Sequence, residues 1–199
     1  MEIKAVIFDL DGTITQPFFD FDMIREQMGL NKDDGPILEA MEKMQPLQRQ
    51  EAERILHIHE QKAVEQSILN DGAKETLQFL RWASIPVGIL TRNRKANVLA
   101  VAAKHGLQFD AVVDRDDGPV KPDAFGVLEI CRQLYTEPHN VLVVGDYLFD
   151  LLSARSAGAV SVLFASHKRA AEFAMYADFT ICRLQDVLEI VSESKRNRG

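Results

Sequence analysis

Short apolar runs recur along the chain, and segments with helical spacing of apolar residues separate most of them. The runs lie at residues 5–8, 86–90, 111–113, 141–144, 160–164 and 179–181. Nearly continuous apolar composition is typical of strands that are buried on both faces, as in a parallel sheet. The pattern therefore predicts six strands in a mainly parallel sheet.

The segments between the later runs carry the signals of helix ends. The predicted helices span residues 71–82, 93–106 and 122–134. Asp71 and Asn93 are candidate N-caps of the first two. Gly106 is a candidate C-cap, and Pro122 fits a first helical turn. Alternating strands and helices predict an α/β fold with a three-layer, Rossmann-like core, which binds ligands at the carboxyl ends of its strands.

Residues 16–70 interrupt this alternation, because they contain no apolar run of the strand type. The helices predicted there span residues 21–30, 37–44 and 47–69. Within the last helix Leu47, Ile58 and Leu69 recur every eleven residues, about three helical turns, and should form one stripe. The pattern predicts a small helical cap inserted after the first strand, with a core of residues 1–15 and 71–199. We expect residues 192–199 to be a frayed tail.

Composition and charge narrow the class of protein. The chain has 199 residues, roughly 1.3 times a domain of about 150 residues, which fits one domain with an insertion. The net charge of −7 argues against nucleic acid or an anionic membrane as a partner. Cys131 and Cys182 are too few, and too far apart in the sequence, for a disulfide framework. The sequence has no long apolar run, so we expect neither a signal peptide nor a membrane span. We therefore expect a cytoplasmic protein, and the sequence favours no particular oligomeric state.

The first apolar run ends in two carboxylates. Asp9 and Asp11 stand two residues apart, and the two-residue period of a strand places them on the same side. Gly12 lets the chain turn and lets backbone amides approach an anion. Two neighbouring carboxylates need a cation or a shared proton, and Mg²⁺, which prefers hard oxygen ligands, supplies the cation. Taken alone, the pair is equally compatible with two turn carboxylates at a strand end.

A second acidic pair follows the run at 141–144. Gly145 and Asp146 end that run, and Asp150 comes four residues later. Four residues at a helix start bring the second carboxylate back towards the first. On its own, Asp150 would also suit a helix N-terminus, where negative charge is stabilising.

Two further polar positions follow predicted strands. Thr91, Arg92 and Asn93 come after the run at 86–90, where a hydroxyl and helix-opening amides can bind phosphate oxygens. Lys121 stands between two prolines before a predicted helix and could reach the same crevice as a point charge. An exposed loop lysine is the alternative interpretation of Lys121.

The order of these groups is more specific than any one of them. An acid pair, a threonine, a lysine and a second acid pair follow one another, each near the carboxyl end of a predicted strand. In order and spacing they resemble the four short motifs of the haloacid dehalogenase superfamily. The helical stretch 16–70 stands where the phosphatase branch of that family inserts a small cap, as in phosphoglycolate phosphatases.

The resemblance implies a Mg²⁺-dependent phosphatase acting on a small phosphorylated metabolite. Asp9 would be the nucleophile that accepts the phosphoryl group, and Asp11 would protonate the leaving oxygen and then activate water. The residues implied as catalytic are Asp9, Asp11, Thr91 and Lys121. Those implied to bind substrate are Gly12, Thr91, Arg92, Asn93 and Lys121. The ligands implied for Mg²⁺ are Asp9, Asp11, Asp146 and Asp150.

Two positions depart from the family pattern, and we expect both at the site entrance. Tyr147 stands where Ser or Thr often follows the second motif aspartate, and Arg92 stands where small or neutral residues are frequent. We expect these side chains to influence substrate preference and to leave the core chemistry intact.

Three alternatives share parts of this pattern. A phosphoglucomutase-like phosphotransferase has the same motifs and differs in isomerising its substrate rather than releasing phosphate. A receiver-like signalling module also combines acids, Thr, Lys and Mg²⁺, but Asp11 supplies an acid and base for turnover that such a module lacks. Dehalogenation is disfavoured, since that branch of the family lacks the second acid.

Overall fold

The structure is a computed structural model that describes residues 2–196, with the backbone alone at Arg196. The chain forms two compact units. One unit combines Met1–Pro17 with Ile68–Gly199, and the other is Phe18–Ser67. The segment predicted as an insertion, residues 16–70, contains the second unit, and each unit is described by itself below.

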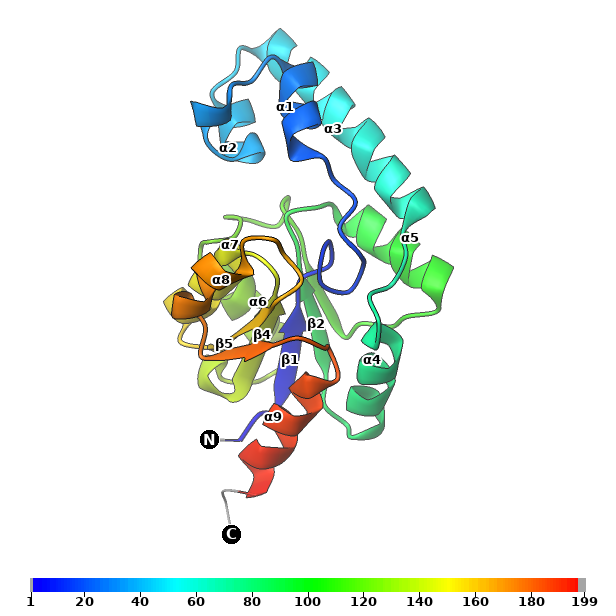
Figure 1. Cartoon of the computed structure of the whole chain (residues 1–199), viewed down its shortest axis with the longest axis vertical. Coiled ribbons are helices and arrows are strands. Elements are labelled where there is room, and N and C mark those ends of the chain that lie inside the picture. Colours follow the sequence, from blue (N-terminus) through cyan, green and yellow to red (C-terminus); the bar gives the residue numbers. More distant parts are fainter. Residues whose placement is uncertain (1, 197–199) are drawn as a thin grey trace. The chain divides into compact units, whose positions relative to one another are not determined.

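The first unit is built on one parallel sheet with the strand order β3-β2-β1-β4-β5-β6 (Figure 1). Its strands are β1 (Ala5–Phe8), β2 (Val87–Leu90), β3 (Ala111–Val113), β4 (Val141–Gly145), β5 (Val160–Phe164) and β6 (Phe179–Ile181). The six predicted strands are confirmed, because runs of this kind suit a sheet covered on both faces. The order reverses between β1 and β4, which is where a doubly wound sheet opens a crevice for ligands.

Helices cover this sheet and make it the middle of three layers, as predicted. They are α4 (Ala73–Trp82), α5 (Lys95–His105), α6 (Phe125–Gln133), α7 (Leu148–Ala157), α8 (Ala170–Phe173) and α9 (Asp186–Arg196). Short 3₁₀ turns, η2 (Pro138–Asn140) and η3 (Ala174–Tyr176), precede β4 and β6. The helices α6 and α7 pack together over β2 to β5, and Val127 and Ile130 of α6 meet Ile7 and Val143 in one buried cluster. Among residues 2–196, no helix is both long enough and apolar enough to cross a membrane.

Three predicted helix starts in the first unit are wrong by one to three residues. Helix α4 is capped by Gly72, whose φ of 79° is left-handed, and not by Asp71. The N-cap of α5 is Arg94, because the Asn93 side chain is used in the site described below. Helix α6 begins at Phe125 rather than at Pro122, with Ala124 as its N-cap, and the Asp123 carboxylate accepts the Phe125 N–H at 2.8 Å just before the first turn.

The predicted frayed tail is also corrected in part. Helix α9 continues through Arg196, and Val187 and Val191 are buried on its inner face. Such burial holds a terminal helix in place. Residues 197–199, which the prediction also included, lie outside the described part of the chain.

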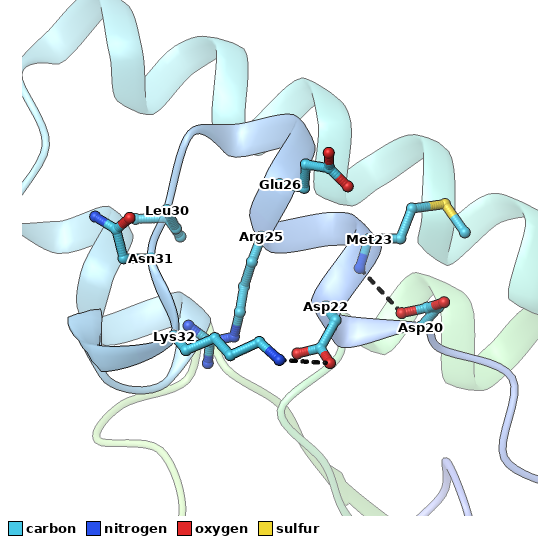
Figure 2. Close-up of a pocket in the computed structure, with 8 residues that line it drawn as sticks. All are labelled: Asp20, Asp22, Met23, Arg25, Glu26, Leu30, Asn31 and Lys32. Carbon is cyan, nitrogen blue, oxygen red and sulfur yellow. Dashed lines mark hydrogen bonds and ion pairs between the residues drawn. The ribbon is translucent and has the colours of Figure 1, made fainter.

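The second unit is helical, as its sequence predicts. It contains α1 (Phe21–Met28), the 3₁₀ turn η1 (Lys32–Asp34), α2 (Ile37–Glu42) and α3 (Pro46–Gln66). Asp20 caps α1 by accepting the Met23 N–H at 2.9 Å (Figure 2). A hollow on this unit is lined by charges of both signs, including Asp22, Arg25 and Lys32 (Figure 2).

The stripe predicted along the long helix is wrong. Leu47 is 83% exposed and Ile58 is 39% exposed, while Leu69 lies beyond the end of α3. The buried positions of α3 are Ala52, Leu56, Glu60 and Ala63. Their spacing of three to four residues follows the helical period, and the first two of them pack in one cluster with Ile24, Ile37 and Met41.

Candidate active site

The sheet brings the two acidic motifs together at its point of reversal. In β1 Phe8 pairs with Val144 of β4, so both strands end at the same level. Asp9 follows β1 directly, and its N–H donates to the Val144 carbonyl at 2.9 Å. Asp146 follows β4 in the same way. Parallel strands whose ends are in register therefore place these two carboxylates side by side.

A buried lysine lies among the carboxylates. The Lys121 ammonium lies 2.5 Å from Asp9 Oδ1 and 2.6 Å from Asp150 Oδ1, and it donates to the Leu90 carbonyl at 3.0 Å. Only 4% of the Lys121 side chain is exposed, so the alternative of an exposed loop lysine is wrong. Carboxylate oxygens of Asp9, Asp146 and Asp150 all lie within 4.8 Å of one another. With all groups ionised, three acids and one lysine leave two uncompensated negative charges.

Burial governs the ionisation of this cluster. Loss of solvent raises the pKa of the Asp9 carboxyl well above its ordinary value, and Lys121 opposes the shift while Asp150, Asp146 and Asp11 add to it. Burial, with repulsion from Asp150, raises the pKa of Asp146 to about 7. Burial disfavours the Lys121 ammonium, but the Asp150 and Asp9 carboxylates outweigh it and raise its pKa. Full ionisation of the three carboxyl groups is therefore unfavourable unless a further cation binds beside them.

Two glycines allow the close approach of these groups. Gly12 has a φ of 96°, a left-handed conformation, and a Cβ built on it would lie 2.6 Å from Asp146 Oδ2. A Cβ on Gly145 would overlap the Asp150 carboxyl group. Gly12 was predicted to bind substrate through its backbone, and the structure places it directly against Asp146.

Asp11 stands at the edge of the cluster and is held by an amide. Asn93 Nδ2 donates to Asp11 Oδ2 at 3.1 Å, and Asn97 Nδ2 donates to Asn93 Oδ1 at 2.7 Å. The Asn93 N–H donates to Thr91 Oγ1 at 3.0 Å. The Asn93 side chain thus holds Asp11 in place, and the binding of substrate by Asn93 stays a prediction. Thr91 is buried, and its hydroxyl keeps its own proton to donate.

Arg92, the second position expected at the site entrance, is engaged inside the first unit. Its guanidinium donates to the Lys121 carbonyl and lies over the Phe149 ring, 5.0 Å from the centroid. Tyr147 packs edge-on against Phe149 and Phe173. Both departures from the family pattern therefore belong to contacts that join the Lys121 loop, α7 and α8.

The sequence interpretation missed several residues around the site. Thr13 Oγ1 lies 3.4 Å from Asp146 Oδ1, and Ser166 Oγ donates to the Gly12 carbonyl at 3.1 Å. Asn70 binds three carbonyls of the loop after Asp11. Asn97 carried one usable signal, since an amide four residues after Asn93 faces it on a helix. Asn70 and Ser166 carried none, because the sheet topology brings them to the loop.

Comparison with known proteins identifies the protein family and several relatives of the chain. Residues 3–158 match the haloacid dehalogenase-like hydrolase family. An uncharacterized hydrolase of Saccharomyces cerevisiae is 29% identical over 95% of this chain and 89% of its own. The phosphoglycolate phosphatase of Chromobacterium violaceum is 24% identical over 95% and 96%, and pyrophosphatase PpaX of Halalkalibacterium halodurans is 24% identical over 98% and 100%.

Solved structures share the fold. A hydrolase from Pseudomonas syringae superimposes with a TM-score of 0.81, covering 96% of this chain and 98% of that chain at 20% identity. The parallel sheet, the acid pairs after β1 and β4, the lysine between them and the match over residues 3–158 agree. The chain is therefore an enzyme that belongs to the haloacid dehalogenase-like hydrolase family.

Proposed function

We propose that this chain is a Mg²⁺-dependent phosphatase that hydrolyses the phosphomonoester of a small metabolite through an aspartyl-phosphate on Asp9. The observation that supports this most is the buried Lys121 ammonium on the Asp9 carboxylate, within a cluster of three acids. A carboxylate can attack a phosphate dianion only where positive charge offsets the repulsion. The relatives named phosphoglycolate phosphatase and pyrophosphatase act, by name, on phosphate compounds.

The donor set fits Mg²⁺. Hard oxygen ligands and two uncompensated negative charges are what a small divalent cation prefers. Asp9 and Asp146 would hold it through their carboxylates, Asp11 through its main-chain carbonyl, and Asp150 directly or through water. When bound, Mg²⁺ offsets phosphate charge and polarises the phosphoryl oxygens.

The residues of the chain have separate tasks in the proposed reaction. An Asp9 carboxylate oxygen attacks phosphorus, the bond to the leaving oxygen breaks, and Asp11 gives that oxygen a proton. Water then attacks the aspartyl-phosphate, gives a proton to Asp11, and releases phosphate with the Asp9 carboxylate restored. The Thr91 hydroxyl would bind a phosphate oxygen during both steps, and Lys121 would neutralise charge on the phosphate and the nucleophile. The hydrogen bond from the Asn93 amide would hold the Asp11 carboxyl group in place for these proton transfers.

A substrate screen tests the proposed function. The purified chain is incubated with phosphoglycolate, pyrophosphate, sugar phosphates and nucleoside monophosphates, each with Mg²⁺ and with a chelator. We expect Mg²⁺-dependent release of inorganic phosphate from at least one small compound, with residues 16–70 acting as the cap that selects it. Isomerisation of a sugar phosphate without phosphate release would favour a mutase. A stable phosphoprotein without turnover would favour a signalling module, and no reaction with any compound would contradict the proposal.

Binding of Mg²⁺ should stabilise the protein more at pH 8 than at pH 5. The folded-state pKa of Asp146, about 7, lies above the ordinary value of 3.8, so the metal-free protein loses stability as pH rises through about 7. Mg²⁺ binds the ionised carboxylates, so it competes with protons below that pH and offsets repulsion above it. Thermal unfolding with Mg²⁺ or chelator at both pH values checks this. A Mg²⁺-induced shift in Tm that is equal or smaller at pH 8 would contradict it.

A further inference from the structure

Three backbone carbonyls of the loop after Asp11 converge on one side-chain amide. Asn70 Nδ2 donates to the carbonyls of Gly12, Thr13 and Thr15 at 3.1, 2.8 and 3.0 Å. All these residues belong to the first unit, and Asn70 is half-buried. One NH₂ group has two protons, so three acceptors share them.

Backbone contacts fix Asn70 in register with this loop. Its own N–H donates to the Ile14 carbonyl at 2.9 Å, and the Gln16 N–H donates to the Ile68 carbonyl at 2.9 Å. The loop also closes on itself, since the Gly12 N–H donates to the Thr15 carbonyl. Residues 10–15 are thus a tight turn whose outward carbonyls face the Asn70 amide.

Without that amide the Thr13 carbonyl would lose the donor that Asn70 supplies, while the Thr15 carbonyl would keep the Gly12 N–H and the Gly12 carbonyl would keep Ser166 Oγ. Partly buried carbonyls that lose their donor carry a desolvation cost, which the loop can relieve only by changing conformation. Neither of those other donors reaches more than one of the three carbonyls, whereas the Asn70 amide ties all three together. The conformation of the turn that carries Asp11 therefore depends on Asn70.

We propose that Asn70 is a positioning residue for the proton transfer of Asp11. The inference rests on the proposed function, in which Asp11 gives a proton to the leaving oxygen. Displacement of a catalytic group by about 1 Å costs up to about 10²-fold in rate. Asn70 touches no reacting atom, and it acts through the backbone of residues 12–15, which directly follow Asp11.

The test compares two substrates that differ in leaving group. Departure of an alkoxide from an alkyl phosphate requires a proton, whereas p-nitrophenolate departs from p-nitrophenyl phosphate with little help. We expect Asn70→Ala to lower kcat/KM for an alkyl phosphate about tenfold more than for p-nitrophenyl phosphate, at saturating Mg²⁺. Asn70→Ser keeps one hydroxyl donor and should recover part of the difference. Gln133→Ala removes an exposed amide from α6 and should leave both rates unchanged.

The outcomes separate this inference from the proposed function. Equal loss on both substrates, or no loss, in Asn70→Ala would overturn the positioning role while leaving the phosphatase intact. If wild-type protein hydrolyses neither substrate class, the proposed function itself fails. Thermal unfolding by circular dichroism establishes that the variants are folded. If Asn70→Ala does not fold, Asn70→Ser is compared with wild type, and the losses of kcat/KM on the alkyl phosphate and on p-nitrophenyl phosphate are compared in the same way.

Discussion

Replacement of Asp9 by asparagine is expected to abolish turnover while the fold survives. An amide oxygen cannot form the aspartyl-phosphate, so kcat should fall by at least about 10⁴-fold, equivalent to roughly 5 kcal/mol at 1.36 kcal/mol per tenfold. The buried Asp9 carboxylate is disfavoured by its desolvation and by three neighbouring acids. Removal of its charge leaves Lys121 paired with Asp150, which limits the cost in stability.

Two measurements check the Asp9 prediction. Phosphate release gives kcat, and borohydride reduction of wild-type protein during turnover should convert the phosphorylated aspartate to homoserine, which peptide mass spectrometry assigns to position 9. The matched control is Glu189→Gln, an acid-to-amide change on the exposed face of α9. Turnover near the wild-type rate in Asp9→Asn, or reduction at another aspartate, would sink the assignment of the nucleophile.

Replacement of Lys121 by methionine should damage both stability and activity. Removal of one partner from a buried pair costs about 3–5 kcal/mol, and here it leaves Asp9 and Asp150 facing each other without compensation. We expect kcat/KM to fall by about 10³-fold, since a preorganised positive charge is lost at the reacting group. Protonation of the carboxyls relieves the repulsion, so the loss of stability should be largest at high pH and shrink as pH falls.

A double-mutant cycle makes the Lys121 prediction specific. Adding Asp150→Asn to Lys121→Met removes one of the facing charges and should recover part of the lost free energy of unfolding, measured by urea denaturation. Activity should stay low in Lys121→Met and in the double variant alike. Lys74→Met, on the exposed face of α4, is the control and should be neutral. Additive effects of Lys121→Met and Asp150→Asn would show that the buried pair is not coupled.

The sheet could be predicted from the sequence because strands that are buried on both faces consist almost entirely of apolar residues. The run at 160–164 reads as a strand on its own, and β5 has those bounds. Helix starts were less accurate, because a cap depends on which side chain is free to bind the first turn. Asn93 has the right chemistry for a cap, but its amide binds Asp11 and Asn97 instead. Tertiary contacts at the site took precedence over the local preference.

The site residues that directly follow a strand could be predicted from the sequence. Asp9 and Asp146 lie together because two strands end in register, a consequence of the predicted fold. The contacts of Asn70 and Arg92 could not be foreseen, since they join segments far apart in the sequence through turns. Arg92 binds the carbonyl of Lys121, a contact that no residue pattern indicates, and its expected influence at the site entrance stays a prediction. Such contacts depend on loop conformation, for which residue patterns carry little information.

The paired backbone at residues 14–16 and 68–70 determines how the chain tolerates a change in the length of the segment between them. Thr15 and Leu69 form an antiparallel bridge, so the chain leaves the first unit and returns to it at neighbouring points. The segment between them is a closed loop, and the entropy of closing a loop grows only slowly with its length. Insertions of very different size can therefore be exchanged at this junction without disturbing the turn that carries Asp11. The junction thus separates the length of the inserted segment from the conformation of the turn that carries Asp11.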